Sequence, residues 1–160
     1  MAGKAYGKVL PYGFRGNVTR TPDTIIGAFN NVGTDNIQYG SPVVYDATNK
    51  GVRAVKSTDN NANLIVGIAV RHIGQPKVDS PSGWYYAPGE TVDVLLRGTI
   101  AIETKAQTGM AAMGQVYVDP SDGEFTSVST SNLAMPNTIF ATGKYDTDKI
   151  SEVTILKRSI

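Results

Sequence analysis

The sequence predicts an all-β fold, and three observations support this prediction. The chain contains 16 Val, 12 Ile and 16 Thr but only 6 Leu, and branching at Cβ favours extended backbone. Its 17 Gly and 8 Pro are spread along the sequence, as turns between short strands require. From Thr91 to Glu103, apolar residues alternate with mainly polar ones without a break. A repeat of two is the side-chain period of a β-strand, so we expect a long strand there with an apolar, even-numbered face in the core.

Residues 1–40 differ from the rest of the chain and are expected to form an extended N-terminal arm. Nine glycines and prolines interrupt this segment, and short apolar islands lie between them. Such a pattern suits neither a long helix nor a long strand, and its Ile and aromatic residues argue against a purely solvated tail. The arm therefore needs a surface to lie on. The alternative is an irregular segment wrapped on its own domain.

Residues 41–160 are expected to form a single all-β domain. Ala47–Gly51 and Asp119–Gly123 have the composition of tight hairpin turns. Gly98 stands at the middle of the long strand, where it would ease a bend in the sheet. The predicted strands are Pro42–Ala47, Gly51–Lys56, Leu64–Ile73, Thr91–Glu103, Gly114–Asp119, Glu124–Val128, Thr138–Tyr145 and Ser151–Lys157.

The order of hairpin, polar loop and apolar strand occurs twice, once from Gly40 and once from Gly114. Two sheet halves of similar plan, joined by the strand Thr91–Glu103, would fit a sandwich or a barrel. A chance similarity between two common hairpins is the alternative.

Residues 74–90 are a polar, proline-rich loop insertion that carries three adjacent aromatic residues, Trp84, Tyr85 and Tyr86. Exposing three neighbouring rings is unfavourable. They either pack back on the core as a lid or mark a contact surface.

Charge and composition exclude several function classes. The 15 Lys and Arg nearly balance the 14 Asp and Glu, which argues against a protein whose main task is to bind nucleic acid. The absence of cysteine excludes disulfides, thiolate metal sites and a Cys nucleophile. Residues 1–8 lack the apolar core of a signal peptide, and no segment is apolar over the length of a membrane span. We therefore expect a soluble protein that is not exported.

Motifs for catalysis or cofactor binding are also missing. His72 is the only histidine, and no Gly-x-Ser-x-Gly motif accompanies it. No glycine-rich phosphate-binding motif occurs. The segment Asp119–Glu124 lacks the ligand spacing of a calcium loop, and a hairpin turn explains it better. We expect neither a catalytic residue nor a metal site.

Six segments bounded by Gly or Pro follow one another in a specific order over nearly the whole chain: residues 6–18, 22–26, 40–46, 67–70, 88–100 and 114–119. In this order the chain resembles the structural cement, or decoration, proteins of tailed-bacteriophage capsids. The resemblance implies a jelly-roll-like sandwich or small β-barrel bound to the outside of the coat shell, with no enzyme activity and no cofactor. Its partners would be the major capsid protein and other copies of the chain, as a dimer or trimer. Direct contact with nucleic acid or a membrane is not implied, and assembly would occur in the host cytoplasm.

A cement protein needs a stiff body that bridges neighbours and an arm that lies across them, so we expect partner contacts on the arm and on the aromatic loop. The candidate contacts are Tyr6, Leu10, Tyr12, Phe14, Arg15, Ile25, Ile26, Phe29, Trp84, Tyr85 and Tyr86. Two other functions stay open: another virion component, such as a head-fibre base or tail module, and a carbohydrate-binding module whose aromatic loop stacks on sugars. An enzyme is the least supported class.

Overall fold

The computed structural model describes residues 13–72, 84–105, 110–146 and 148–159. In this part the chain forms eleven strands and one short 3₁₀ helix (η1), Ala62–Leu64, and the all-β prediction is confirmed. None of its helices has the length and apolar character needed to cross a membrane. The strands are β1 (Val18–Asn30), β2 (Ile37–Gln38), β3 (Pro42–Asp46), β4 (Gly51–Ala54), β5 (Ile65–Ala69), β6 (Tyr85–Tyr86), β7 (Thr91–Glu103), β8 (Gln115–Val118), β9 (Phe125–Thr126), β10 (Leu133–Tyr145) and β11 (Ile150–Ile155).

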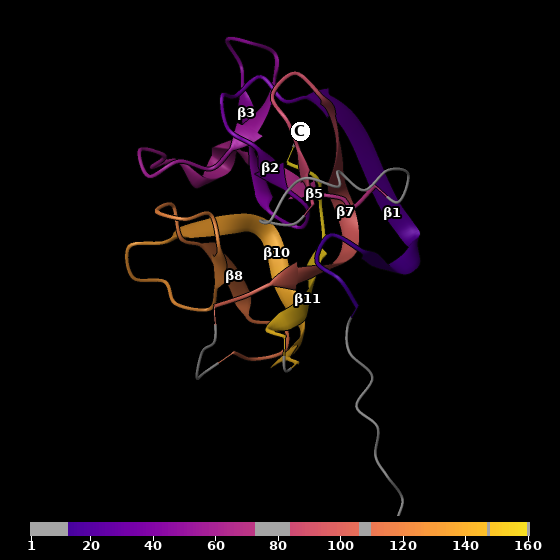
Figure 1. The fold of residues 1–160 in the computed structure, drawn as a ribbon. Helices are drawn as coiled ribbons and strands as arrows, with labels where there is room; N and C mark the ends of the chain where they lie inside the picture. Colours follow the sequence, from indigo (N-terminus) through magenta and orange to yellow (C-terminus); the bar gives the residue numbers. More distant parts are fainter. Residues whose placement is uncertain (1–12, 73–83, 106–109, 147, 160) are drawn as a thin grey trace, which may run out of the picture.

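Strand β7 is shared by two halves of the main sheet (Figure 1). Along one edge it pairs with β1, from Thr91 to Ile100. Along the other edge it pairs first with β5, at Val94 and Leu95, and then with β11, from Gly98 to Glu103. The change of neighbour occurs next to Gly98, whose φ is +124°. The bend expected at this glycine is therefore also the point where β7 passes from one half of the sheet to the other.

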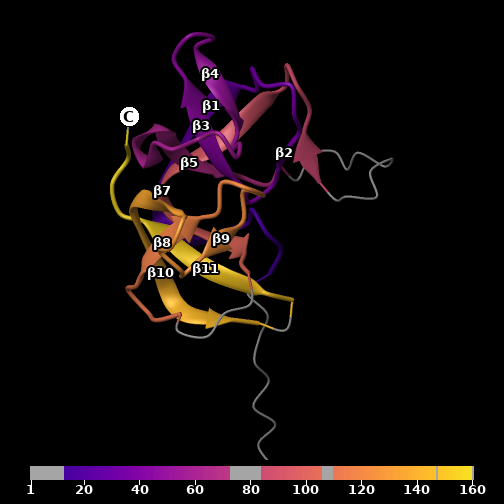
Figure 2. The same cartoon turned by 90° about the vertical axis from the view of Figure 1, so that its left-hand side faces the viewer.

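The two halves have the same local plan. The sheet order is β4-β3-β5-β7-β11-β10-β8-β9, so that β3 lies between β4 and β5 as β8 lies between β9 and β10. Figures 1 and 2 show the early strands gathered above the late strands, with β7 connecting them. The predicted plan of two hairpin units joined by one long strand is confirmed at the level of strand order. Both halves of the sheet also curl. In the first half an isolated bridge joins Asn31, after β1, to Val52 on β4, and in the second half another joins Thr104, after β7, to Phe125 on β9.

Side chains of β7 contribute to two hydrophobic cores. Every even-numbered residue of β7 is buried, as predicted. Before Gly98, these residues (Val92, Val94 and Leu96) lie in a first core with Ile37, Val43 and Tyr86. After Gly98, they (Ile100 and Ile102) lie in a second core with Phe125 and Phe140, which Leu95 and Ile68 enter from the first half. The apolar face of β7 thus changes from one core to the other at its glycine.

The expectation that residues 1–40 contain no long strand is wrong. β1 has 13 residues, although its register with β7 is broken at three places between Val18 and Ile26. In the described residues β1 has β7 as its one ladder partner, and an edge position tolerates such breaks and a proline. Ile37 and Tyr39, further along the expected arm, are buried in the first core. Residues 13–40 therefore lie on the chain's own domain, and the division at residue 40 stays a prediction.

Gly98→Ala should destabilise the protein by about 1–3 kcal/mol, because a Cβ at this positive φ would also lie 3.2 Å from Asp23 O and Thr24 Oγ1. Gly89→Ala is the matched control, since Gly89 has a φ of +81° but nothing within 4 Å of the added Cβ. Urea unfolding of each variant measures its loss in free energy of unfolding relative to the wild type. Equal losses would contradict a specific role for the close approach of β1 to Gly98.

Candidate functional site

Three residues from distant parts of the chain form an exposed cluster. The guanidinium carbon of Arg71 lies 4.6 Å from the ring centroid of Phe14 and 4.6 Å from that of Trp84. Phe14 is 68% exposed and Trp84 is 41% exposed, so each ring keeps surface open to solvent. We call these three residues the Arg71 cluster. It combines two candidate contact residues with an arginine that follows the buried strand β5.

Backbone hydrogen bonds fix the Phe14 side of the Arg71 cluster. The amide of Asn17 donates to the carbonyl of Phe14 at 3.1 Å, which closes a turn. Within that turn, Gly16 donates to the carbonyl of Ala101 on β7 at 2.7 Å and accepts from the amide of Arg71 at 2.8 Å. Gly16 has a φ of +82°, and a Cβ there would lie 2.9 Å from the amide nitrogen of Gly40. Only glycine fits this crossing of backbones.

The first core fixes the Trp84 side of the cluster. The amide of Tyr39 donates to the carbonyl of Trp84 at 3.0 Å, next to the β2–β6 pairing. The ring centroids of Tyr39 and Trp84 are 6.4 Å apart. Tyr86 is only 6% exposed, its hydroxyl donates to the carbonyl of Val70 at 2.7 Å, and burial raises the pKa of its phenol. Of the aromatic loop, Tyr86 therefore packs into the core, Tyr85 is half-buried and Trp84 is exposed.

A second exposed surface lies on β1. Ile25 and Ile26 are exposed, whereas Phe29 packs against the first core with its ring edge-to-face on Tyr45, at a centroid distance of 6.5 Å. A hollow of about 310 Å³ lies next to this surface, lined by Arg20, Asp23, Arg97, Gly98, Thr99, Thr154, Ile155 and Leu156. Leu156 is exposed as well. The other candidate contacts, Tyr6, Leu10 and Tyr12, lie outside the described residues.

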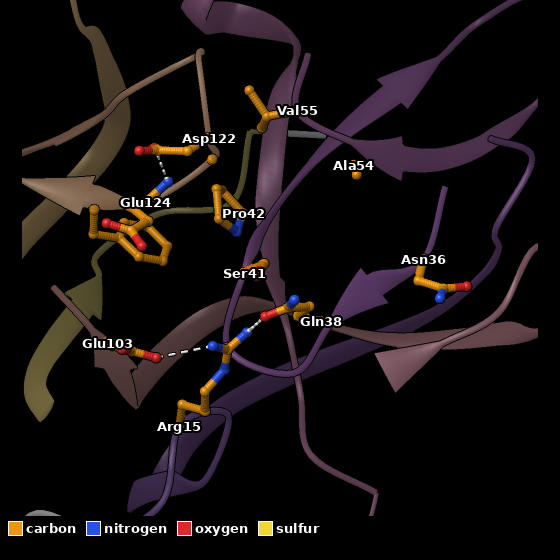
Figure 3. A pocket seen from close by; sticks show the side chains of 13 residues that line it. Arg15, Asn36, Gln38, Ser41, Pro42, Ala54, Val55, Glu103, Asp122 and Glu124 are labelled. Atoms are coloured by element: carbon orange, nitrogen blue, oxygen red, sulfur yellow. Dashed lines mark hydrogen bonds and ion pairs between the residues drawn. The ribbon is translucent and has the colours of Figure 1, made fainter. Parts of the chain in front are cut away.

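Arg15 connects the two halves of the sheet (Figure 3). Its Nη1 lies 2.9 Å from Glu103 Oε2, its Nε donates to the carbonyl of Tyr39 at 2.6 Å, and its Nη2 donates to the side chain of Gln38. It borders a hollow of about 230 Å³ lined by Ala54 and Val55 from the first half and by residues 122–125 from the second. Its donors are engaged within the chain, so this candidate contact has a structural role in the isolated protein.

Several of the titratable side chains in the described residues are paired within the chain. They contain no group of three or more His, Asp or Glu side chains that could hold a metal ion. His72 is exposed, and its Nδ1 lies 3.7 Å from Asp93 Oδ2. The hollow near Arg15 is lined by Glu103, Asp122 and Glu124, of which Glu103 is paired with Arg15 and Asp122 lies 2.6 Å from Lys105 Nζ. The exposed apolar side chains are instead suited to a partner surface.

Sequence reasoning did not single out Arg71 as a candidate contact residue. The signal available was its position, directly after the apolar run of β5 and before the insertion. That position predicts a strand end, but not that the rings of Phe14 and Trp84 contact the guanidinium.

Comparison with known proteins gives one family and one fold. The family model described as structural cement protein (E217 gp24/Pam3 gp6) matches residues 2–156. No curated protein matches the chain. Among solved structures, a chain of "The capsid of Myoviridae Phage XM1" superposes with a TM-score of 0.75 and 18% sequence identity, covering 99% of each chain. At this identity the likeness concerns the fold, and it extends over the whole of both chains.

Asp119→Asn should make the protein less sensitive to acid between about pH 4 and pH 2. Its hydrogen bonds with Lys105 and Ser121 lower the pKa of Asp119 to about 2, from 3.8. A lowered pKa in the folded state contributes stability above the unfolded pKa, and this stability is lost as pH falls towards 2. Urea midpoints measured across this pH range should fall less steeply for Asp119→Asn than for the wild type. Parallel pH profiles would contradict the pairing.

Proposed function

The chain belongs to the structural cement protein family, and from this premise we propose that it binds the outside of a phage capsid shell and links neighbouring major capsid proteins. Membership makes it a phage structural protein, consistent with its likeness to a chain of a phage capsid. The binding of the shell, its exterior position and the bridging of subunits are the proposal. The observation that carries it is the match of the family model to residues 2–156, almost the whole chain.

The surface of the molecule supports this role. Phe14 and Trp84 in the Arg71 cluster, together with Ile25 and Ile26 on β1, are large apolar side chains left exposed. Each region is small, and each contact would be weak by itself. On a closed shell with many copies, the contacts of one chain with several neighbours act together, as linked binding sites do. The body is suited to bridging, because β7 ties both halves of the sheet into one unit.

The carbohydrate-binding alternative has less support from the same residues. A sugar ring binds aromatic side chains by stacking on an open ring face. In the Arg71 cluster the guanidinium already lies over one face of Phe14 and one face of Trp84, and Tyr86 is buried. A tail or head-fibre component would use similar apolar contacts, so its location in the particle separates it from a cement protein.

The proposal predicts saturable binding to capsids that lack this protein. Shells of the phage that encodes the chain, prepared without it, should pellet the added protein and become more resistant to heat. Cryo-electron microscopy of the complex should place its density on the outer face, between capsid subunits. Density in the tail, or no association with shells, would overturn the proposal. Sedimentation velocity of the free protein tests the accompanying expectation of a dimer or trimer.

Two deletions test the contribution of the N-terminal segment. Removing residues 2–12 leaves every described strand in place, so we expect a folded protein whose shell binding is weakened by about tenfold or more through loss of Tyr6, Leu10 and Tyr12. Removing residues 2–39 also removes β1 and two core residues, Ile37 and Tyr39, and should prevent folding. Circular dichroism reports folding and pelleting reports binding.

A full-length variant with Ser at positions 6, 10 and 12 is the matched control for chain length. It should bind shells as weakly as the shorter deletion. Wild-type affinity in both would show that the segment before Gly13 is not a contact.

A further inference from the structure

We propose that Arg71 is the docking point for a carboxylate of a major capsid protein subunit. This inference rests on the proposed function and specifies the chemistry of one contact within it. The proposed site is the guanidinium of Arg71, whose carbon lies 4.6 Å from the ring centroids of both Phe14 and Trp84.

The side-chain Nε of Arg71 donates no hydrogen bond within the described part of the chain, whereas its backbone amide donates to the carbonyl of Gly16. Four other arginines there pair with carboxylates: Arg15 with Glu103, Arg20 with Glu152, Arg53 with Asp59 and Arg97 with Asp23. Arg71 makes no such pair among the described residues, and its Nε is buried without a hydrogen-bond partner. A buried donor without an acceptor is unfavourable, so the hydrogen-bonding capacity of the Arg71 side chain is not satisfied by the described residues.

The two rings prepare the guanidinium for a partner. A free arginine side chain loses rotamer freedom when it is fixed at an interface, which opposes binding. In the Arg71 cluster, contact with the rings of Phe14 and Trp84 restrains the guanidinium beforehand. The backbone that carries the cluster is also held, because Arg71 donates to Gly16 and Trp84 accepts from Tyr39. The planar fork of Arg matches the two oxygens of a carboxylate. Apolar ring surface next to the contact excludes water and strengthens the charged hydrogen bond.

Nearby charges favour an acidic partner. Glu103 is paired with Arg15, and Asp93 Oδ2 lies 3.7 Å from His72 Nδ1. No carboxylate oxygen of the described residues forms an ion pair with Arg71. The cluster therefore presents a positive charge framed by two exposed rings. An acidic side chain of the partner, with apolar atoms next to it, complements both features.

The test compares Arg71→Gln with Arg158→Gln in binding to capsids that lack this protein. Both variants lose one positive charge at an exposed or partly exposed position, but only the first lies in the cluster. We expect Arg71→Gln to weaken binding by about tenfold or more, and Arg158→Gln to bind like the wild type. The affinity of Arg71→Lys for capsids should lie between those of the wild type and Arg71→Gln, because lysine keeps the charge but lacks the planar guanidinium. Wild-type binding should also be more sensitive to salt than that of Arg71→Gln.

Chemically modified shells identify the group that Arg71 meets. Amidating the carboxylates of the shell with a carbodiimide and ethanolamine should remove the advantage of the wild type over Arg71→Gln. If the wild type keeps its advantage on amidated shells, the docking group is not a carboxylate and the inference is wrong. This arm uses the wild-type chain and stays informative even if Arg71→Gln folds poorly, because the affinity of the wild type must itself fall.

The outcomes separate this inference from the proposed function. Shells that bind the wild type and Arg71→Gln equally would overturn the carboxylate contact and leave the cement role intact. Shells that bind neither protein would overturn both. A shift in self-association by Arg71→Gln, with unchanged shell binding, would assign the cluster to a second copy of the chain and would also overturn the inference.

Discussion

The structure depends on a single strand, β7, which pairs with strands of both sheet halves and contributes side chains to both hydrophobic cores. Both of its edges carry backbone hydrogen bonds, and its even-numbered side chains lie in the first core before Gly98 and in the second core after it. One face of a strand can contact two different cores only where the backbone departs from regular pleating. The positive φ of Gly98 provides that departure. β1 crosses directly over this point, so the absence of a Cβ is a condition for pairing as well.

The position of the Arg71 cluster follows from this arrangement. The turn that carries Phe14 is held by hydrogen bonds to Ala101, on the second part of β7, and to Arg71, at the end of the strand that pairs with the first part. Arg15, in the same turn, is paired with Glu103 at the end of β7. The exposed rings are therefore fixed to the junction of the two halves. A partner contact at this junction would involve both halves of the body, as the proposed bridging role requires.

Sequence reasoning was most successful where pairing is regular. The bounds of β7 and its buried face follow from simple alternation, and both hairpins follow from local turn residues. It failed for β1, because three breaks in register disrupt the alternation of its side chains. It also failed for the start of β10, which was predicted at Thr138 but lies at Leu133, because the φ of +52° at Asn137 interrupts the regular strand pattern. The partnership of Phe14, Arg71 and Trp84 could not be predicted, because it is created by the meeting of three segments and not by spacing.

The sheet edges also constrain how partners can bind. The curling bridges Asn31–Val52 and Thr104–Phe125 cover the outer strands β4 and β9, but β1 is left with a long edge in the described structure. Such an edge invites pairing with other chains. Here it is interrupted by breaks in register, by Pro22, which has no amide hydrogen to donate, and by Arg20 and Asp23, which are paired with Glu152 and Arg97. Strand addition is thereby disfavoured, and the exposed rings of Phe14 and Trp84 instead favour the proposed recognition of a partner by side chains.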